Sequence, residues 1–151
     1  MADARILSTD DDLVDALAPL LGQAIRRQLW LFFLDENDGI TDPIMPCDDF
    51  PADPYEPIQT VDIGAQGFAH VMAERVRHLQ SEFDLATLMI VWERVGSRRF
   101  AGKDLARARA MAESCATVGV PLRAQLLLHD DGLRLITPDD IGELTIRRRS
   151  A

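Results

Sequence analysis

Positive charge and cysteine are both scarce in this 151-residue sequence. The chain has 16 lysine and arginine residues against 25 acids, a net charge of −9, and only two cysteines. Nucleic acids require a basic binding face, so this balance disfavours a DNA partner. Cys47 and Cys115 stand in unrelated contexts and give no support for a disulfide. No apolar run approaches the length of a membrane span, and no apolar targeting segment opens the chain, so we expect a cytoplasmic protein with no membrane partner.

The cations that are present avoid one long stretch of the chain. No lysine or arginine lies between Arg27 and Arg75, whereas ten acids do. Five of the eight prolines fall in residues 40–57, which we expect to form an acidic loop with a short edge strand at 44–45, because proline limits strands to sheet edges. A loop of this length is usually functional or mobile. Its candidate interaction residues are Asp48, Asp49, Phe50, Asp53 and Tyr55.

Apolar periodicity along the chain predicts three helices and about five strands. The helices are expected at 10–26, 65–81 and 103–118, and the strands at 29–34, 58–63, 85–92, 120–128 and 133–136. This alternation predicts an α/β fold, a three-layer sandwich with a mixed central sheet. We expect residues 1–151 to form a single domain, with a core at about 10–137 and a basic tail at 145–151.

Two segments of the sequence resemble metal-binding motifs but lack the ligand spacing that these motifs require. Residues 35–39, Asp-Glu-Asn-Asp-Gly, suggest a calcium loop, but the glycine falls one position early and no bidentate glutamate follows at the required distance. They predict a hairpin turn instead. His70 and His78 are too far apart on their helix for the zinc pair that i and i+4 spacing gives, so we predict surface or boundary positions for both.

The stretch 85–119 organises the rest of the chain. An apolar strand leads into a charged, glycine-containing loop at 93–102, and that loop opens a helix rich in small residues, with Gly119 as its stop and Cys115 on its buried face. In α/β domains the loop that follows a central strand is the usual place for chemistry. This loop contains no nucleophile–base pair, no phosphate cradle and no cluster of metal ligands.

Two segments, LWLFFLDENDGI and ATLMIVWERVGSRRFAGKDLARARAMAESCATVGVPLRAQLLLHDDG, together resemble the JAB/MPN superfamily, in particular its RadC-type domain. The likeness covers roughly residues 27–137 and implies a JAB/RadC-like sandwich of cytidine-deaminase-like architecture. Gly96 stands where the family has its loop glycine, and Asp104 stands where it has its motif aspartate. Active members hold a zinc ion with this aspartate and two histidines, and a glutamate on the early strand activates the bound water.

The sequence departs from the family at the residues that carry the chemistry. Val91 and Glu93 occupy the two histidine positions, Ala101 occupies the serine position, and Arg27-Gln28 marks the region of the glutamate without an acid. Zinc sites with three protein ligands lose affinity steeply when two are replaced. The resemblance therefore implies a degenerate, metal-free pseudoenzyme with no cofactor and no catalytic residue.

Two functions fit these observations. The preferred one is a non-catalytic module that acts by protein–protein interaction, with the acidic loop docking on a basic partner; a homodimer through helices or sheet edges fits the same interpretation. The alternative is a small-ligand-binding or hydrolytic protein that uses a remnant pocket at the end of strand 85–92. The N-terminus of the following helix and the cations of the loop would suit a carboxylate or phosphate ligand there. Asp104 is either an acid at the positive helix start or an ion-pair partner of Arg98 or Arg99. The remnant pocket would comprise Glu93, Arg98, Arg99 and Asp104.

Overall fold

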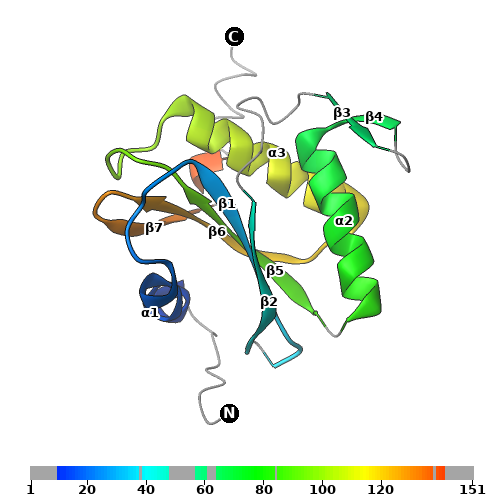
Figure 1. Ribbon diagram of the computed structural model, residues 1–151, viewed down its shortest axis with the longest axis horizontal. Coiled ribbons are helices and arrows are strands. Elements are labelled where there is room, and N and C mark those ends of the chain that lie inside the picture. Colours follow the sequence, from blue (N-terminus) through cyan, green and yellow to red (C-terminus); the bar gives the residue numbers. More distant parts are fainter. Residues whose placement is uncertain are drawn as a thin grey trace.

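A computed structural model describes residues 10–37, 39–47, 57–60, 64–83, 85–137 and 139–141 of the chain (Figure 1). The helices in these ranges are α1 (Asp10–Leu21), α2 (Phe68–Glu82) and α3 (Gly102–Val118). The strands are β1 (Gln28–Leu34), β2 (Ile40–Cys47), β3 (Pro57–Thr60), β4 (Gly64–Gly67), β5 (Thr87–Glu93), β6 (Leu122–His129) and β7 (Gly132–Ile136).

Five of the strands form one mixed sheet in the order β2-β1-β5-β6-β7. β1 is antiparallel to both β2 and β5, β5 and β6 are parallel, and β7 is antiparallel to β6. The parallel pair needs a crossover, which α3 supplies. In Figure 1, α1 lies on one side of the sheet, and α2 and α3 lie on the other. The predicted α/β class and the mixed central sheet are confirmed.

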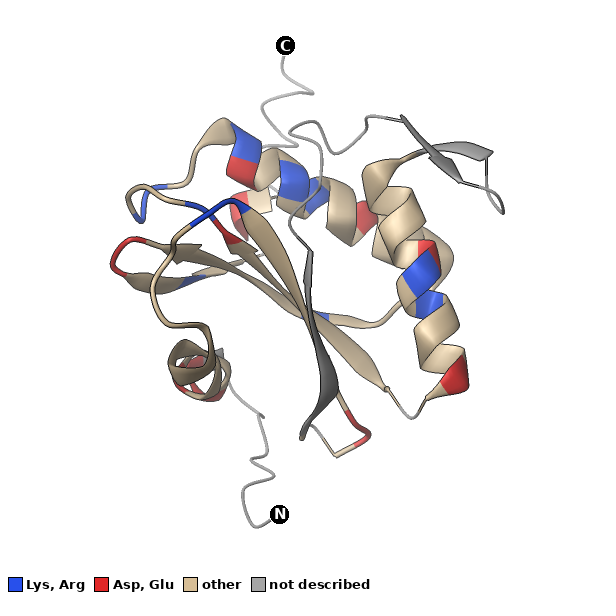
Figure 2. Cartoon of the chain, in the orientation of Figure 1, with Lys and Arg blue, Asp and Glu red and all other residues tan. Residues whose placement is uncertain are grey.

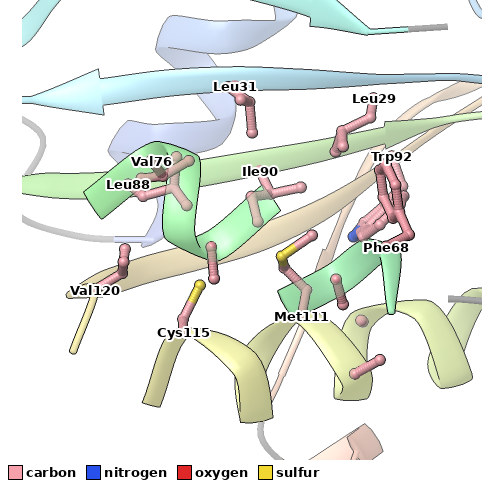
Figure 3. Close-up of a cluster of buried hydrophobic side chains, with 14 of the residues drawn as sticks. Leu29, Leu31, Phe68, Val76, Leu88, Ile90, Trp92, Met111, Cys115 and Val120 are labelled. Carbon is pink, nitrogen blue, oxygen red and sulfur yellow. The ribbon is translucent and has the colours of Figure 1, made fainter. Parts of the chain in front are cut away.

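The two faces of the sheet bury separate hydrophobic cores. β1 and β5 are apolar on both faces, so alternate residues of each strand contribute to opposite cores. Figure 3 shows the larger core, in which residues of β1 and β5 meet Phe68 and Val76 of α2 and Met111 and Cys115 of α3. The smaller core lies under α1 and consists of Leu13, Leu17, Phe32, Leu34, Met89, Val91, Leu126 and Leu128.

The first helix ends earlier than predicted. α1 stops at Leu21 because Gly22 has a φ of +70°, a left-handed conformation that glycine adopts at little cost, and its N–H still reaches the Ala18 carbonyl at 3.2 Å. Arg26, the last residue of the predicted helix, therefore lies instead in the connection to β1. This connection lies beside the end of β5, where it is part of the candidate site.

The start of α2 is also corrected. The predicted helix 65–81 begins at Phe68 instead, because residues 64–67 form β4 and pair with β3 in a separate two-stranded sheet. Gly64 and Gly67 explain the difference, since glycine is a poor helix former. The predicted strand at 58–63 is confirmed for 58–60, and residues 61–63 lie outside the described residues.

The hairpin interpretation of residues 35–39 is confirmed, because β1 and β2 are antiparallel and join at this turn. The Asp35 carboxylate accepts hydrogen bonds from the N–H groups of Asn37 and Gly39 at 2.8 and 3.0 Å. Its Oδ1, which would bind the cation in a calcium loop, is therefore used to close the turn. β2 is an edge strand, as expected for a segment with two prolines, but it is longer than the predicted 44–45. None of the described helices is long and apolar enough to cross a membrane.

Candidate functional site

Glu93 is the last residue of β5 and not, as predicted, the first residue of the loop. Because side chains alternate along a strand, Glu93 faces the same side of the sheet as Val91, toward α1. Its side chain is buried, with the whole residue only 2% exposed. Burial of a carboxylate is costly unless hydrogen bonds compensate for the lost water, and Glu93 has such partners in the segment that leads into β1.

Four donors contact the Glu93 carboxylate. Oε1 accepts the Gln28 side-chain amide and the Trp30 indole N–H, both at 2.9 Å. Oε2 accepts the backbone N–H groups of Ile25 and Arg26 at 2.8 and 3.2 Å. Burial by itself raises the pKa of Glu93, but these hydrogen bonds together outweigh it, and the pKa lies below its ordinary value. The carboxylate is thus ionised at neutral pH and ties the α1–β1 connection to β5.

Asp104 occupies the third position of α3 and is also buried. It forms an ion pair with Arg94, whose Nη2 lies 2.8 Å from Oδ2 and whose Nε lies 3.1 to 3.2 Å from both carboxylate oxygens. Oδ2 also accepts the Ala101 N–H at 2.8 Å, which satisfies a donor at the helix start. The predicted position at the helix start is confirmed, while the predicted partners, Arg98 or Arg99, are wrong: the partner is Arg94.

Arg94 holds the whole loop between β5 and α3. Besides the pair with Asp104, its guanidinium donates to the carbonyls of Ser97 and Arg99 at 2.7 and 2.9 Å. Gly96 makes this curl possible, because its φ of +129° is unfavourable for other residues and an added Cβ would lie 2.9 Å from Arg94 Nη1. The loop therefore has a defined shape built around one side chain.

The structure does not bring the four predicted residues of the remnant pocket into one network. The described hydrogen bonds join Glu93 to β1 and to the connection before it, and join Asp104 to Arg94 and Ala101. Arg98 and Arg99 have exposed side chains on the outside of the loop. Their carbonyls accept hydrogen bonds from Arg134 and Arg94, both at 2.9 Å.

Val91, which the resemblance would place at a zinc-ligand position, and the nearby His129 are used for packing and for internal contacts. Val91 is fully buried in the core under α1. His129, which ends β6 nearby, is buried and its Nδ1 accepts the Asp131 N–H at 3.1 Å. Burial, with a smaller contribution from neighbouring arginines, lowers the pKa of His129, so the ring is neutral at pH 7. Within the described ranges, no group of three or more His, Cys, Asp or Glu side chains is placed to hold a metal ion.

A groove of about 730 Å³ lies elsewhere, between α3, β6 and β7. Cys115 is at its floor, fully buried and free of any disulfide, and burial raises the pKa of its thiol to about 11. The core position predicted for Cys115 is confirmed, and a thiol with so high a pKa is not a nucleophile at neutral pH. The sequence did not indicate this groove, because small residues on a helix usually indicate close packing.

The remaining sequence predictions have mixed outcomes. His70 and His78 are half-buried and exposed, as expected, and each lies beside a glutamate one helical turn later. The candidate interaction residues of the acidic loop lie outside the described residues. Sequence reasoning missed the role of Arg94, which it treated as one of several loop cations, and it missed Gln28 and Trp30 as partners of Glu93.

The sequence matches no protein-family model, and a comparison with curated proteins gives no significant match.

Proposed function

We propose that this protein is a non-catalytic, metal-free module of the JAB/RadC type that acts by binding another protein. One observation carries the first part: the three positions where active members hold zinc are all used for structure. Val91 is in the core, Glu93 accepts four hydrogen bonds, and Asp104 is paired with Arg94. A carboxylate surrounded by donors has little basicity to offer to a water molecule or a metal ion.

The strand order is compatible with the same assignment. A central strand and a helical crossover flank the loop from Arg94 to Ala101, and Asp104 follows that loop at the helix start. This is where the resemblance would place the motif aspartate. In our proposal Asp104 has been retained for the stability of the loop, while the ligands that gave it a catalytic role have been replaced.

The hydrolytic alternative has less support. It needs a general base or a metal ion at the end of β5, and the acids there are engaged in the contacts described above. It also needs a cavity for substrate, and the groove described above, which is lined by α3, β6, β7 and residue Ile141, does not include Glu93 in its lining.

Metal content tests the first part of the proposal. Untagged protein is dialysed against zinc-containing buffer and then against buffer alone, and zinc per chain is measured by elemental analysis. We expect well below one equivalent. An Asp104→Ala variant carried through the same procedure shows whether any residual zinc depends on the motif aspartate. Retention of one zinc per chain that is lost in this variant would refute the metal-free assignment.

Exchange of the acidic loop tests the second part. Residues 46 and 47 belong to β2 and pair with Trp30 and Leu29, so the exchange has to begin after them. We replace residues 48–56 with a Gly/Ser linker of equal length and measure binding to an oligolysine peptide, which represents a basic partner. Binding should be lost in this variant and kept in the wild type. Equal binding by both proteins would contradict a role of this loop.

A further inference from the structure

The cations of this acidic protein gather at one end of the sheet. Twelve of its lysines and arginines lie within the described ranges, and eight of these belong to four short segments around the carboxyl end of β5. Figure 2 shows the corresponding blue segments near the start of β1, on the loop before α3 and on the first turns of α3. The eight are Arg26, Arg27, Arg94, Arg98, Arg99, Lys103, Arg107 and Arg134.

Contacts bring these segments together. The backbone N–H of Arg26 donates to Glu93 at the end of β5, which fixes the first segment there. Arg134 of β7 donates to the Arg98 carbonyl at 2.9 Å and stacks over the Phe100 ring at 3.8 Å, which fixes the fourth segment against the loop. We refer to the exposed side chains of this surface, namely Arg26, Arg27, Arg98, Arg99 and Lys103, as the arginine face.

The acids named in the same region are fewer than its eight cations. The carboxylates of Glu93 and Asp104 are buried and point inward to their donors, so they are not presented on the surface. Asp130 and Asp131 are exposed in the turn after β6, which lies against the loop because the Asp130 N–H donates to the Gly96 carbonyl at 2.9 Å. The pKa values of two buried groups in the region reflect this excess of positive charge. Besides burial, the field of Arg27 and Arg94 lowers the pKa of the buried Arg107, which lies 3.9 Å from the single carboxylate of Asp104. Burial is the main cause of the lowered pKa of His129; Asp131 opposes it, and Arg94, Arg98 and Arg134 add to the lowering.

We propose that the arginine face binds an acidic segment of a partner protein through its aspartate and glutamate carboxylates. Guanidinium groups bind carboxylates in a planar, bidentate manner, and four of the five cations are arginines. They come from separate parts of the chain and their side chains are exposed, which suits an extended partner better than a small ligand. The inference goes beyond the proposed function, because it does not depend on the acidic loop or on the metal-free assignment.

Nucleic acid is the main competing anion, and two features disfavour it. Single strands bind through stacking of bases on exposed aromatic rings. The Phe100 ring lies under Arg134, and the half-buried Trp30 ring is stacked on Phe32 and bonded to Glu93, so neither offers a free platform. Duplex DNA carries a much higher charge density than an acidic peptide, and the net charge of −9 repels it correspondingly.

Fluorescence anisotropy with a labelled oligoglutamate peptide tests the proposal. The Arg98→Ala/Arg99→Ala variant removes two charges from the arginine face, and both side chains are exposed, so folding should be retained. The matched control, Arg75→Ala/Arg77→Ala, removes two charges from α2 and changes the net charge equally. We expect the first variant to weaken binding by about fivefold, the control to change it by less than about twofold, and added salt to weaken binding by the wild type.

Three results would overturn the proposal. Equal losses in the two variants would mean that binding follows net charge and not this surface. A single-stranded oligonucleotide of equal charge that binds more tightly than the peptide would assign the face to nucleic acid. Full displacement of the peptide by an equal concentration of inorganic phosphate would indicate a small-anion site.

Discussion

Replacement of Glu93 by glutamine tests how much of the fold depends on one buried carboxylate. Each Glu93 oxygen accepts two hydrogen bonds, from Gln28 and Trp30 on one side and from two backbone N–H groups on the other. Glutamine keeps one acceptor oxygen and turns an NH₂ group toward the other two donors. Two charge-assisted bonds are lost at about 1.5 kcal/mol or more each, so we expect the free energy of unfolding to fall by roughly 3 kcal/mol.

The loss is large enough to measure by urea denaturation followed by tryptophan fluorescence. A change of this size should lower the melting temperature by roughly 10 °C in a protein of this length. The matched control is Glu82→Gln on α2, where an exposed carboxylate lies 2.9 Å from His78, and its effect should stay within about 0.5 kcal/mol. An unfolding midpoint for Glu93→Gln equal to that of the wild type would refute this account of the site.

The pH dependence gives the same prediction a second readout. The folded pKa of Glu93 lies below the unfolded value of 4.5, so protonation favours the unfolded chain. Its contribution is present above about pH 4.5 and is lost as the pH falls through the folded pKa. The difference in unfolding free energy between the wild type and Glu93→Gln should therefore be constant near neutral pH and shrink in acid. A gap that widens on acidification would contradict the lowered pKa.

Two further predictions follow from the same stretch of chain. Asp104→Asn removes the charge that pairs with Arg94 while leaving an acceptor for the Ala101 N–H, and we expect a loss of about 2 to 4 kcal/mol in urea denaturation. A loss in the Arg94→Ala/Asp104→Asn double variant that is smaller than the sum of the two single losses would show their coupling. An unchanged midpoint in Asp104→Asn would contradict the ion pair. In a Cys47→Ala background, the Cys115 thiol, buried and with a pKa of about 11, should react with a disulfide reagent at pH 8 only after denaturation; rapid reaction of the folded protein would mean that the groove opens to its floor.

The sequence was sufficient for the elements whose signal is local. β1 and β5 were recognisable because a strand buried on both faces is apolar throughout. The end of α3 and the turn after β1 were recognisable from their glycines and aspartates. The end of α1 carries the same kind of signal in Gly22, but the predicted helix extends to residue 26, because cations such as Arg26 are also common at helix ends.

The candidate site was less predictable because its contacts join distant parts of the chain. Nothing local indicates that Glu93 faces Gln28 and Trp30, since this depends on the register of β1 against β5. Arg94 and Asp104 were each visible as charged residues beside a glycine loop. Their pairing required the curl of that loop, which places a strand-end arginine over a helix start and leaves Arg98 and Arg99 outside. Composition alone could not separate an engaged cation from an exposed one.

The position of β1 between β2 and β5 has a consequence for synthesis of the chain on the ribosome. β2 follows β1 directly in the chain, but the strand on the other side of β1 is β5. Leu34 can pair with Thr87 only after β5 has been synthesised. Until then the segment LWLFFL has one open edge, and such apolar, β-prone segments associate with other chains when exposed. Arg26 and Arg27 before it and Asp35 and Glu36 after it are charges of the kind that limit such association. Variants that neutralise these flanking charges should therefore yield more insoluble protein during expression, even where the finished fold is as stable as before.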